Sequence, residues 1–415
     1  MRPLETLPIN ECWECSHCTQ CCRGSEIVLD RADLQRLNQQ HWERRPEFAH
    51  QRVIERAGLL SPRYRLARRA DHGCVFLTEQ GRCRVHQEFG FAAKPLVCQL
   101  YPLQVVPVAG QLILTLRRSC PSAAADLGPS IREYERQVRA AIGRRPGLGK
   151  AGEPPAILRG LGRNWGDTLL IADGFTRLLN DSRFPLVRRL VHGLQFCDLL
   201  EKCQLQPLDS ARLGELVDLL VQAAPEESGD WFRPRRPPQG LARLLFRQVL
   251  PEYLRLEPRF QVRPSCRQRL RMVRVSIGFA LGRGGVPALL PGFPQPRFDD
   301  LEQRALGPLP PPLQDSLTRY YAAQTASHQY LLFGRAGWTL VERFRALALT
   351  FPVGMWTLRY FCGSQPPSND DVLRAVTLID RGQGVAPLAG APHRRRITHL
   401  ARLGELQRLC AWYAR

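Results

Sequence analysis

From residue 156 to residue 415, leucine, valine and phenylalanine recur at spacings of three and four residues. This period places them on one face of an α-helix. The expected helices cover residues 166–180, 185–203, 209–224, 239–256, 266–282, 312–332, 336–361, 369–381 and 397–414. The segments between them are rich in proline, which interrupts helices. Residues 156–415 are therefore predicted to form an all-α domain.

The clearest β-pattern lies in the first part of the chain. Residues 103–108 and 112–116 are rich in valine and leucine and flank a turn at Ala109-Gly110, which predicts a β-hairpin. Cys98 and Cys120 lie almost symmetrically about that turn. The hairpin is therefore expected to bring these two thiols close together.

Shorter elements surround this hairpin. A strand is expected over residues 26–29, and a smaller hairpin over residues 73–86. Asp30 is the predicted N-cap of the helix that follows it. Ser130-x-x-Glu133 has the spacing of a capping box, so another helix is expected to begin there.

Together these patterns predict a mainly α fold in two parts. Residues 11–142 are expected to form a small α+β or irregular Cys-rich domain that a metal stabilises. Residues 143–155, rich in glycine, proline and arginine, are the predicted linker to the helical domain at 156–415.

The formal net charge of +21 changes this picture little. Only Lys94, Lys150 and Lys202 are lysines, so the 59 basic residues include 59 − 3 = 56 arginines, spread along the whole chain. Nucleic-acid binders usually gather lysine and arginine in a stripe or tail, so this distribution argues against nucleic acid. An acidic protein partner would explain the charge equally well.

The first residues, MRPLETLPINECWEC, have no apolar segment of the secretory type. No window approaches about 18 uninterrupted apolar residues, so no membrane span is predicted. A cytoplasmic location is therefore expected. Thiols stay reduced in that compartment, and clustered cysteines there usually indicate metal or redox chemistry.

Four cysteines lie within eight residues, at Cys15-Ser-His-Cys18-Thr-Gln-Cys21-Cys22. Two thiols at C-x-x-C spacing can bind one soft metal ion. The candidate metal ligands are Cys15, Cys18, Cys21, Cys22, Cys74, Cys83, Cys98 and Cys120. Eight thiolates exceed the four that one tetrahedral zinc takes. They would suit two zinc ions, or one Fe–S cluster with four thiols left for a second ion or for structure.

Other residues carry weaker signals. His17, His72 and His86 lie near the candidate ligands and could substitute as nitrogen ligands, but a surface or outer-shell role is favoured for each. Five further cysteines lie in apolar helical segments and are predicted to be small buried thiols: Cys197, Cys203, Cys266, Cys362 and Cys410. No pattern identifies a catalytic residue.

The cysteine pattern resembles the CxxCxxCC family, the YkgJ-type cysteine cluster proteins described as zinc- or iron-chelating. The family's later steps are similar to Cys74-Val75-Phe76-Leu77, to Cys83-Arg84-Val85-His86 and to Lys94-Pro95-Leu96-Val97-Cys98-Gln99-Leu100-Tyr101-Pro102, with Cys120 as the closing cysteine. Lys94 and Gln99 stand where the family has arginine, and His86 where it usually has tyrosine. The resemblance covers about a quarter of the chain and implies metal binding by the eight cysteines.

The helical part resembles, less specifically, the C-terminal region of flagellin lysine N-methylases. The similar segments are Leu169 to Leu200 and Leu317 to Leu349, the second with Tyr320-Tyr321 and Tyr330. That resemblance implies methyl transfer from S-adenosylmethionine to a protein lysine, with an Fe–S cluster taking part. The one notable glycine cluster, Gly282 to Gly285, follows a helical stretch and is interpreted as a loop, not as a cofactor-binding turn.

Three functions therefore stay open. The leading one is a metal-binding protein whose thiolates carry an Fe–S cluster, with 4Fe–4S favoured over zinc. The second is an S-adenosylmethionine-dependent protein-lysine N-methyltransferase. The third is a helical interaction module with a structural zinc site and a basic surface for an acidic partner.

Overall fold

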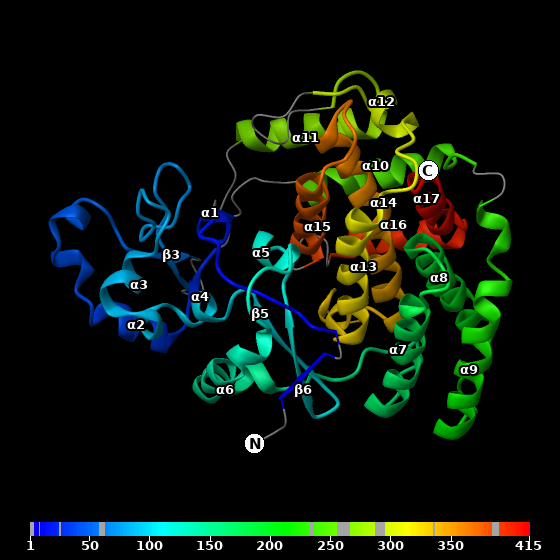
Figure 1. The fold of residues 1–415 in the computed structure, drawn as a ribbon, viewed down its shortest axis with the longest axis horizontal. Helices are drawn as coiled ribbons and strands as arrows, with labels where there is room; N and C mark the ends of the chain where they lie inside the picture. The colour runs from blue at the N-terminus through cyan, green and yellow to red at the C-terminus, as the bar shows by residue number, and fades with distance from the viewer. Residues whose placement is uncertain are drawn as a thin grey trace.

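The computed structural model describes residues 4–7, 9–24, 26–57, 63–232, 236–254, 266–286, 295–334, 337–383 and 390–415. The last two residues of the helix expected over 239–256, and the first of the one expected over 336–361, lie outside the described residues. Figure 1 shows residues from about 20 to 100 at the left, the helices that follow residue 156 at the right, and the first residues of the chain between them.

The first part of the chain contains two small sheets and short helices. The strands are β1 (Leu4–Thr6), β2 (Val28–Leu29), β3 (Ile54–Ala57), β4 (Arg63–Leu66), β5 (Leu103–Val108) and β6 (Gln111–Leu116). The helices are α1 (Gln20–Gly24), α2 (Arg31–Asn38), α3 (Arg84–Phe89), α4 (Leu96–Leu100), α5 (Pro121–Ala124) and α6 (Glu135–Arg144). The sheet orders are β1-β6-β5 and β2-β4-β3.

The predicted hairpin is confirmed as β5 and β6, which pair antiparallel from Leu103–Leu116 to Val108–Gln111. β1 adds to β6 in parallel, a pairing that the sequence pattern did not predict. Because successive side chains of a strand point to opposite faces, this sheet is buried on both sides. Leu114 faces an apolar cluster with Val138 of α6, whereas Ile113 faces one with Ala323 of the helical region.

The second part is helical. Its helices are α7 (Trp165–Asn180), α8 (Leu186–Lys202), α9 (Ser210–Glu226), α10 (Gly240–Leu254), α11 (Cys266–Leu281), α12 (Phe298–Gln303), α13 (Pro311–Ala326), α14 (Leu340–Cys362), α15 (Asn369–Gln383), α16 (Ala391–Arg402) and α17 (Glu405–Tyr413). Helix α14 is buried along nearly its whole length, including the charged side chains of Glu342, Arg343, Arg345 and Arg359. A single large apolar core surrounds it.

The predicted fold class, mainly α with a small strand-containing first part, is confirmed. Several local predictions were wrong. The helix expected over 312–332 ends at Ala326, because His328 has φ 53°, and Gln329–Leu332 form a separate 3-10 helix. The helix expected over 397–414 is divided into α16 and α17, because Gly404 between them has φ 64°. The hairpin expected over 73–86 is reduced to one bridge between Leu77 and Cys83, since the chain enters α3 at Arg84.

Helix boundaries follow from local signals. Asp30 caps α2 as predicted, with a reciprocal capping box to Asp33. Ser130 does begin a helical segment, but its hydroxyl accepts from the amide of Arg132 and the first turn is a 3-10 helix, so the expected box with Glu133 does not form. Among the described residues no helix combines the length and apolarity needed to cross a membrane.

Candidate metal centre

The first cysteine segment combines irregular backbone with a short helix. Cys15 and Cys18 are exposed and lie before α1, whereas Cys21 and Cys22 are half-buried on α1. The backbone on both sides of Cys18 is left-handed, with φ 54° at His17 and 61° at Thr19. Residues other than glycine rarely adopt this backbone conformation, so the segment carries local strain next to a candidate ligand.

Five thiols gather around one small apolar core, which we call the small core. Its buried members are Ile27, Leu29, Leu37, Trp42, Phe48, Leu66, Ala67, Cys74, Val75, Phe76, Leu77 and Val85. Cys22, Cys83 and Cys98 pack against it from the side. The Sγ of Cys21 lies 3.8 Å from the Sγ of Cys22. We call Cys21, Cys22, Cys74, Cys83 and Cys98 the five-thiol group.

The electrostatics of these thiols agree with their proximity. The pKa of Cys74 is raised to about 11, chiefly by burial, and the thiols of Cys83 and Cys21 contribute to that shift. Burial likewise raises the pKa of Cys98, and Cys74, Cys83 and Cys21 contribute in the same direction. Each thiolate thus disfavours the next, which is the expected behaviour of like charges that converge on one place.

Two cations accompany the five-thiol group. The Arg68 guanidinium donates to the backbone carbonyls of Cys22 and His72. Burial lowers the pKa of Arg68, whereas the nearby thiols of Cys74, Cys22 and Cys98 favour its charged form. Lys94 acts from the other direction, since its charge lowers the pKa values of Cys21 and Cys98 against the effect of burial.

Cys120 belongs to a different environment. It is buried at the N-cap of α5, in the apolar cluster that β1, β5, β6 and α6 share. Burial raises its pKa, and the charge of Cys18 contributes. Cys98 packs instead against the small core, so the hairpin leaves Cys98 and Cys120 in separate apolar clusters rather than in one.

Tyr101 lies between the two environments. Its hydroxyl donates to Ser119 Oγ at 3.3 Å. Burial raises its pKa, and the charges of Cys120, Asp380 and Cys21 act in the same direction. The position of Tyr101 therefore links the closing cysteine, the first cysteine segment and the helical region.

No cysteine forms a disulfide, so all eight candidate thiols are free to ligate. In the part of the chain that the structure describes, no group of three or more His, Cys, Asp or Glu side chains is already arranged to hold a metal ion. Ligation would thus require the candidate donors to lie closer together than they do in this structure. The donor chemistry fits a soft ion, because five thiols and two cations meet in a largely apolar setting.

Other sequence predictions can be placed on the structure. The pKa of His86 is lowered by burial and by the charges of Lys94 and His17, so these three groups lie near one another. Cys197, Cys362 and Cys410 are buried as predicted. Cys266 is exposed and Cys203 is half-buried, so the prediction of a buried thiol was wrong for both.

The comparison with protein families agrees with this arrangement. The model of the CxxCxxCC family, described as a putative zinc- or iron-chelating domain, matches residues 14–121. The CxxCxxCC match thus begins just before Cys15 and ends just after Cys120, and covers about a quarter of the chain. It supports metal chelation without distinguishing zinc from iron. No curated protein and no solved structure matches the chain.

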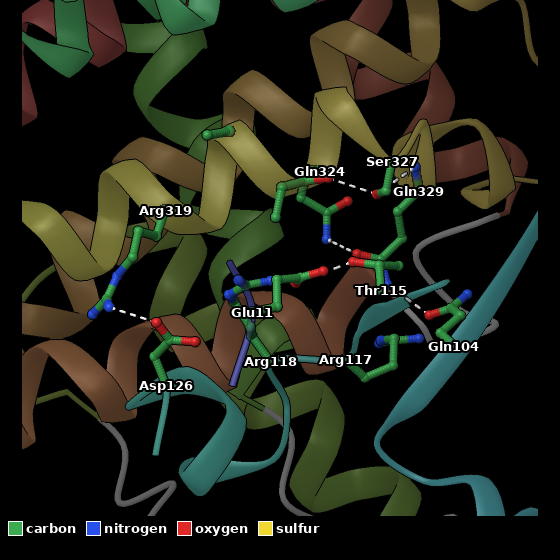
Figure 2. A network of polar contacts seen from close by, with 12 residues as sticks. Glu11, Gln104, Thr115, Arg117, Arg118, Asp126, Arg319, Gln324, Ser327 and Gln329 are labelled. Atoms are coloured by element: carbon green, nitrogen blue, oxygen red, sulfur yellow. Dashed lines mark hydrogen bonds and ion pairs between the residues drawn. The ribbon is translucent and has the colours of Figure 1, made fainter. Parts of the chain in front are cut away.

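A polar network joins the first part of the chain to the helical region, and no local sequence pattern indicates it (Figure 2). Gln329 Nε2 donates to Gln104 Oε1 of β5 at 2.6 Å. Arg319 Nη1 on α13 pairs with Asp126 Oδ2 at 2.8 Å. These contacts join residues about 200 positions apart, so only the folded chain reveals them.

On the sheet side, the network contains a buried ion pair. Glu11 Oε1 accepts from Arg118 Nη1 at 2.9 Å and from Thr115 Oγ1 at 3.1 Å (Figure 2). Burial raises the pKa of Glu11 despite the opposing charge of Arg118. The pair fixes the segment before Cys12 against the strand that leads to Cys120.

Proposed function

We propose that this chain chelates zinc or iron through cysteine thiolates, and that the five-thiol group carries an Fe–S cluster. The observation that supports this most directly is the meeting of Cys21, Cys22, Cys74, Cys83 and Cys98 around one small core. The CxxCxxCC match supports the coarser statement of chelation.

The preference for iron over zinc rests on the weaker resemblance to flagellin lysine N-methylases. One tetrahedral zinc and one Fe–S cluster each take four thiolates, so the fifth thiol, together with Cys15, Cys18 and Cys120, leaves donors for a second ion in either case. A centre made only of thiolates is anionic, and Arg68 and Lys94 lie where their charges would offset it. Such a cluster, when bound, supplies one-electron transfer at a potential that nearby charge and burial tune.

Lysine methylation, which the weaker resemblance implies, stays a prediction. The described residues form two three-stranded sheets, neither of which supplies the strand, glycine-rich turn and helix of a Rossmann-type cofactor site. Gly282 and Gly284 both have positive φ in the turn that follows α11, which agrees with the interpretation of this segment as a loop.

The test compares two buried cysteines. Iron, zinc and sulfide content and visible absorption would be measured on protein purified without oxygen, for the native chain, for Cys74→Ser and for Cys197→Ser. Cys74 lies in the five-thiol group, whereas Cys197 is buried on α8 in the helical core. We expect Cys74→Ser to lose most of the metal and Cys197→Ser to keep it.

The outcomes separate the proposals. Iron with matching sulfide and a broad visible band supports the Fe–S cluster. Zinc without colour would leave a structural chelating domain beside a helical interaction platform, and would remove the basis for redox chemistry. Equal metal content in both variants would contradict ligation by the five-thiol group.

A further inference from the structure

We propose that Asp380, in the helical region, is a positioning residue for Cys120, a candidate metal ligand outside the five-thiol group. This inference rests on the proposed function of metal chelation and extends it to a residue outside residues 14–121. Asp380 lies in the last turn of α15 and is fully buried. Its carboxylate points not into the helical core alone but toward the chain segment that leads to Cys120.

Asp380 holds that segment through three hydrogen bonds. Its Oδ2 accepts from Arg117 Nε at 3.0 Å and from the backbone amide of Ser119 at 2.7 Å. The backbone carbonyl of Asp380 accepts from Arg117 Nη2 at 2.7 Å. Cys120 directly follows Ser119. The backbone of the residue before Cys120 is thus fixed to α15.

The residues after Cys120 are fixed to the same helix. Cys120 is the N-cap of α5, and α5 packs against α15. Figure 1 shows these two helices side by side where the sheet meets the helical region. A candidate ligand held on both sides by one helix has little freedom to move unless that contact changes.

The same turn of α15 reaches the first cysteine segment. Arg381 Nη2 donates to the side-chain Oε1 of Gln20 at 3.3 Å, and Gln20 directly precedes Cys21. Tyr101, whose hydroxyl bonds Ser119, lies within the electrostatic reach of both Cys21 and Cys120. One turn of a distant helix therefore contacts both ends of the candidate ligand set.

The second oxygen of Asp380 anchors the contact in the helical region. Gln324 Nε2 on α13 donates to Oδ1 at 3.3 Å and also to Gln329 Oε1 at 2.7 Å. Gln329 in turn bonds Gln104 of β5. Removing the carboxylate would leave the amide of Ser119 and the Nε of Arg117 without this buried acceptor, which is costly, although Arg117 Nη2 would keep its bond to the backbone carbonyl of residue 380. The segment would then move to regain hydrogen bonds, and Cys120 would move with it.

Outer-shell partners that orient metal ligands typically contribute about 10- to 100-fold to metal affinity. We therefore expect Asp380→Ala to bind Co²⁺ about 10- to 100-fold more weakly than the native chain. The intensity of the thiolate-to-cobalt absorption at saturation should also fall, because one thiolate is displaced. Asp380→Asn keeps an oxygen acceptor for Ser119 and should show a smaller loss.

The experiment titrates Co²⁺ into the metal-free, full-length chain under anaerobic conditions, in competition with a chelator. Asp198→Ala is the matched control. Asp198 is also a helical aspartate that accepts from one arginine and one other side chain, Arg345 and Gln407, both at 2.7 Å. It lies on α8, so its loss should weaken the helical core without changing cobalt affinity or spectrum.

The failure of each proposal has its own signature. A native chain that binds neither cobalt, zinc nor iron would overturn the proposed chelation and this inference with it. A native chain that binds cobalt, beside folded Asp380→Ala and Asp380→Asn variants with unchanged affinity and spectrum, would overturn the role of Asp380 alone. Equal losses in Asp380→Ala and Asp198→Ala would also overturn it, since the effect would then come from stability.

Discussion

Buried histidines make the helical region sensitive to acid. His393 on α16 is fully buried, and neither ring nitrogen has a hydrogen-bond partner. Burial lowers its pKa to about 3, and the charge of Arg396 contributes. Glu252 approaches to 3.9 Å, which is beyond hydrogen-bond distance. The fold therefore requires the neutral imidazole.

The sign of the pH effect follows from this shift. An unfolded histidine titrates near pH 6.5, so between pH 6.5 and about 3 the unfolded chain binds a proton that folded His393 does not. The free energy of unfolding should fall in this window by about 1.4 kcal/mol per pH unit for this residue. When the pH is lowered from 7 to 5, we expect the free energy of unfolding of His393→Leu to fall by about 2 kcal/mol less than that of the native chain.

Urea unfolding at several pH values would measure this difference. His399→Leu is the control, because His399 lies on the same helix but is exposed. An identical pH dependence for the native chain and His393→Leu would show that His393 is not responsible. His192 and His328, whose pKa values burial lowers to about 4, would leave a residual acid sensitivity in either variant.

At this scale the sequence identified the ligand candidates but not their surroundings. The C-x-x-C spacing alone identified Cys15, Cys18, Cys21 and Cys22 as candidate metal ligands, because cysteines this close together in sequence usually bind a metal. Nothing in the sequence marked Arg68, since one arginine among many carries no signal until folding places it beside Cys22. Burial also escaped prediction for Cys266, which lies in an apolar segment and is nevertheless exposed.

Close helix packing depends on particular glycines. Gly193 lies in α8 where that helix crosses α14, and a Cβ there would come within 2.3 Å of Phe344 Cζ. Phe344 cannot move aside easily, because its ring stacks on Phe175 with 4.0 Å between ring centroids. The close approach of the two helices therefore requires the absence of a side chain at residue 193.

We expect Gly193→Ala to lower the free energy of unfolding by about 1–3 kcal/mol through overpacking. The matched control is Gly214→Ala in α9, where a Cβ would meet open space. Alanine is the better helix former, so Gly214→Ala should stabilise the chain by up to about 1 kcal/mol. Denaturant unfolding of both variants is the measurement, and effects of the same sign would contradict this account.

Helices were more predictable than their ends. The three- and four-residue spacing of apolar residues predicted α7 to α10 within a few residues of their described ends, because each helix buries one apolar face in a common core. Thr339 and Glu342 form a capping box at the start of α14, a signal in the sequence that places this boundary at residue 340. Gly404 carried a comparable signal for the break between α16 and α17.

For the whole molecule, the sequence predicted the parts but not how they join. The periodic spacing of apolar residues shows which segments are helical. It does not show that Asp380 contacts Ser119, 261 residues earlier in the chain. The expected boundary near residues 143–155 also takes no account of packing. The sheet β1-β6-β5 precedes that boundary, but Ile113 and Val106 pack in one cluster with Ala323 of α13.

This packing predicts which part of the chain depends on metal for its folding. The small core has few buried residues, and four of the five gathered cysteines belong to it or pack against it, so it should depend on metal for stability. The sheet should not, because it is tied to α13 by the cluster around Ile113 and to α15 by Asp380. Removing the metal should therefore loosen residues 26–98 and leave β5 and β6 folded.

Hydrogen exchange with and without a chelator would test this division on the full-length chain. We expect amide protection within 26–98 to fall about 100-fold or more, which corresponds to about 2.7 kcal/mol of local stability. Protection in β5, β6 and α14 should change little, and α14 serves as the internal reference. Loss of protection across β5 and β6 as well would mean that residues 11–142 fold as one metal-dependent unit, against the packing described here. Unchanged protection throughout would mean that the small core is stable without metal.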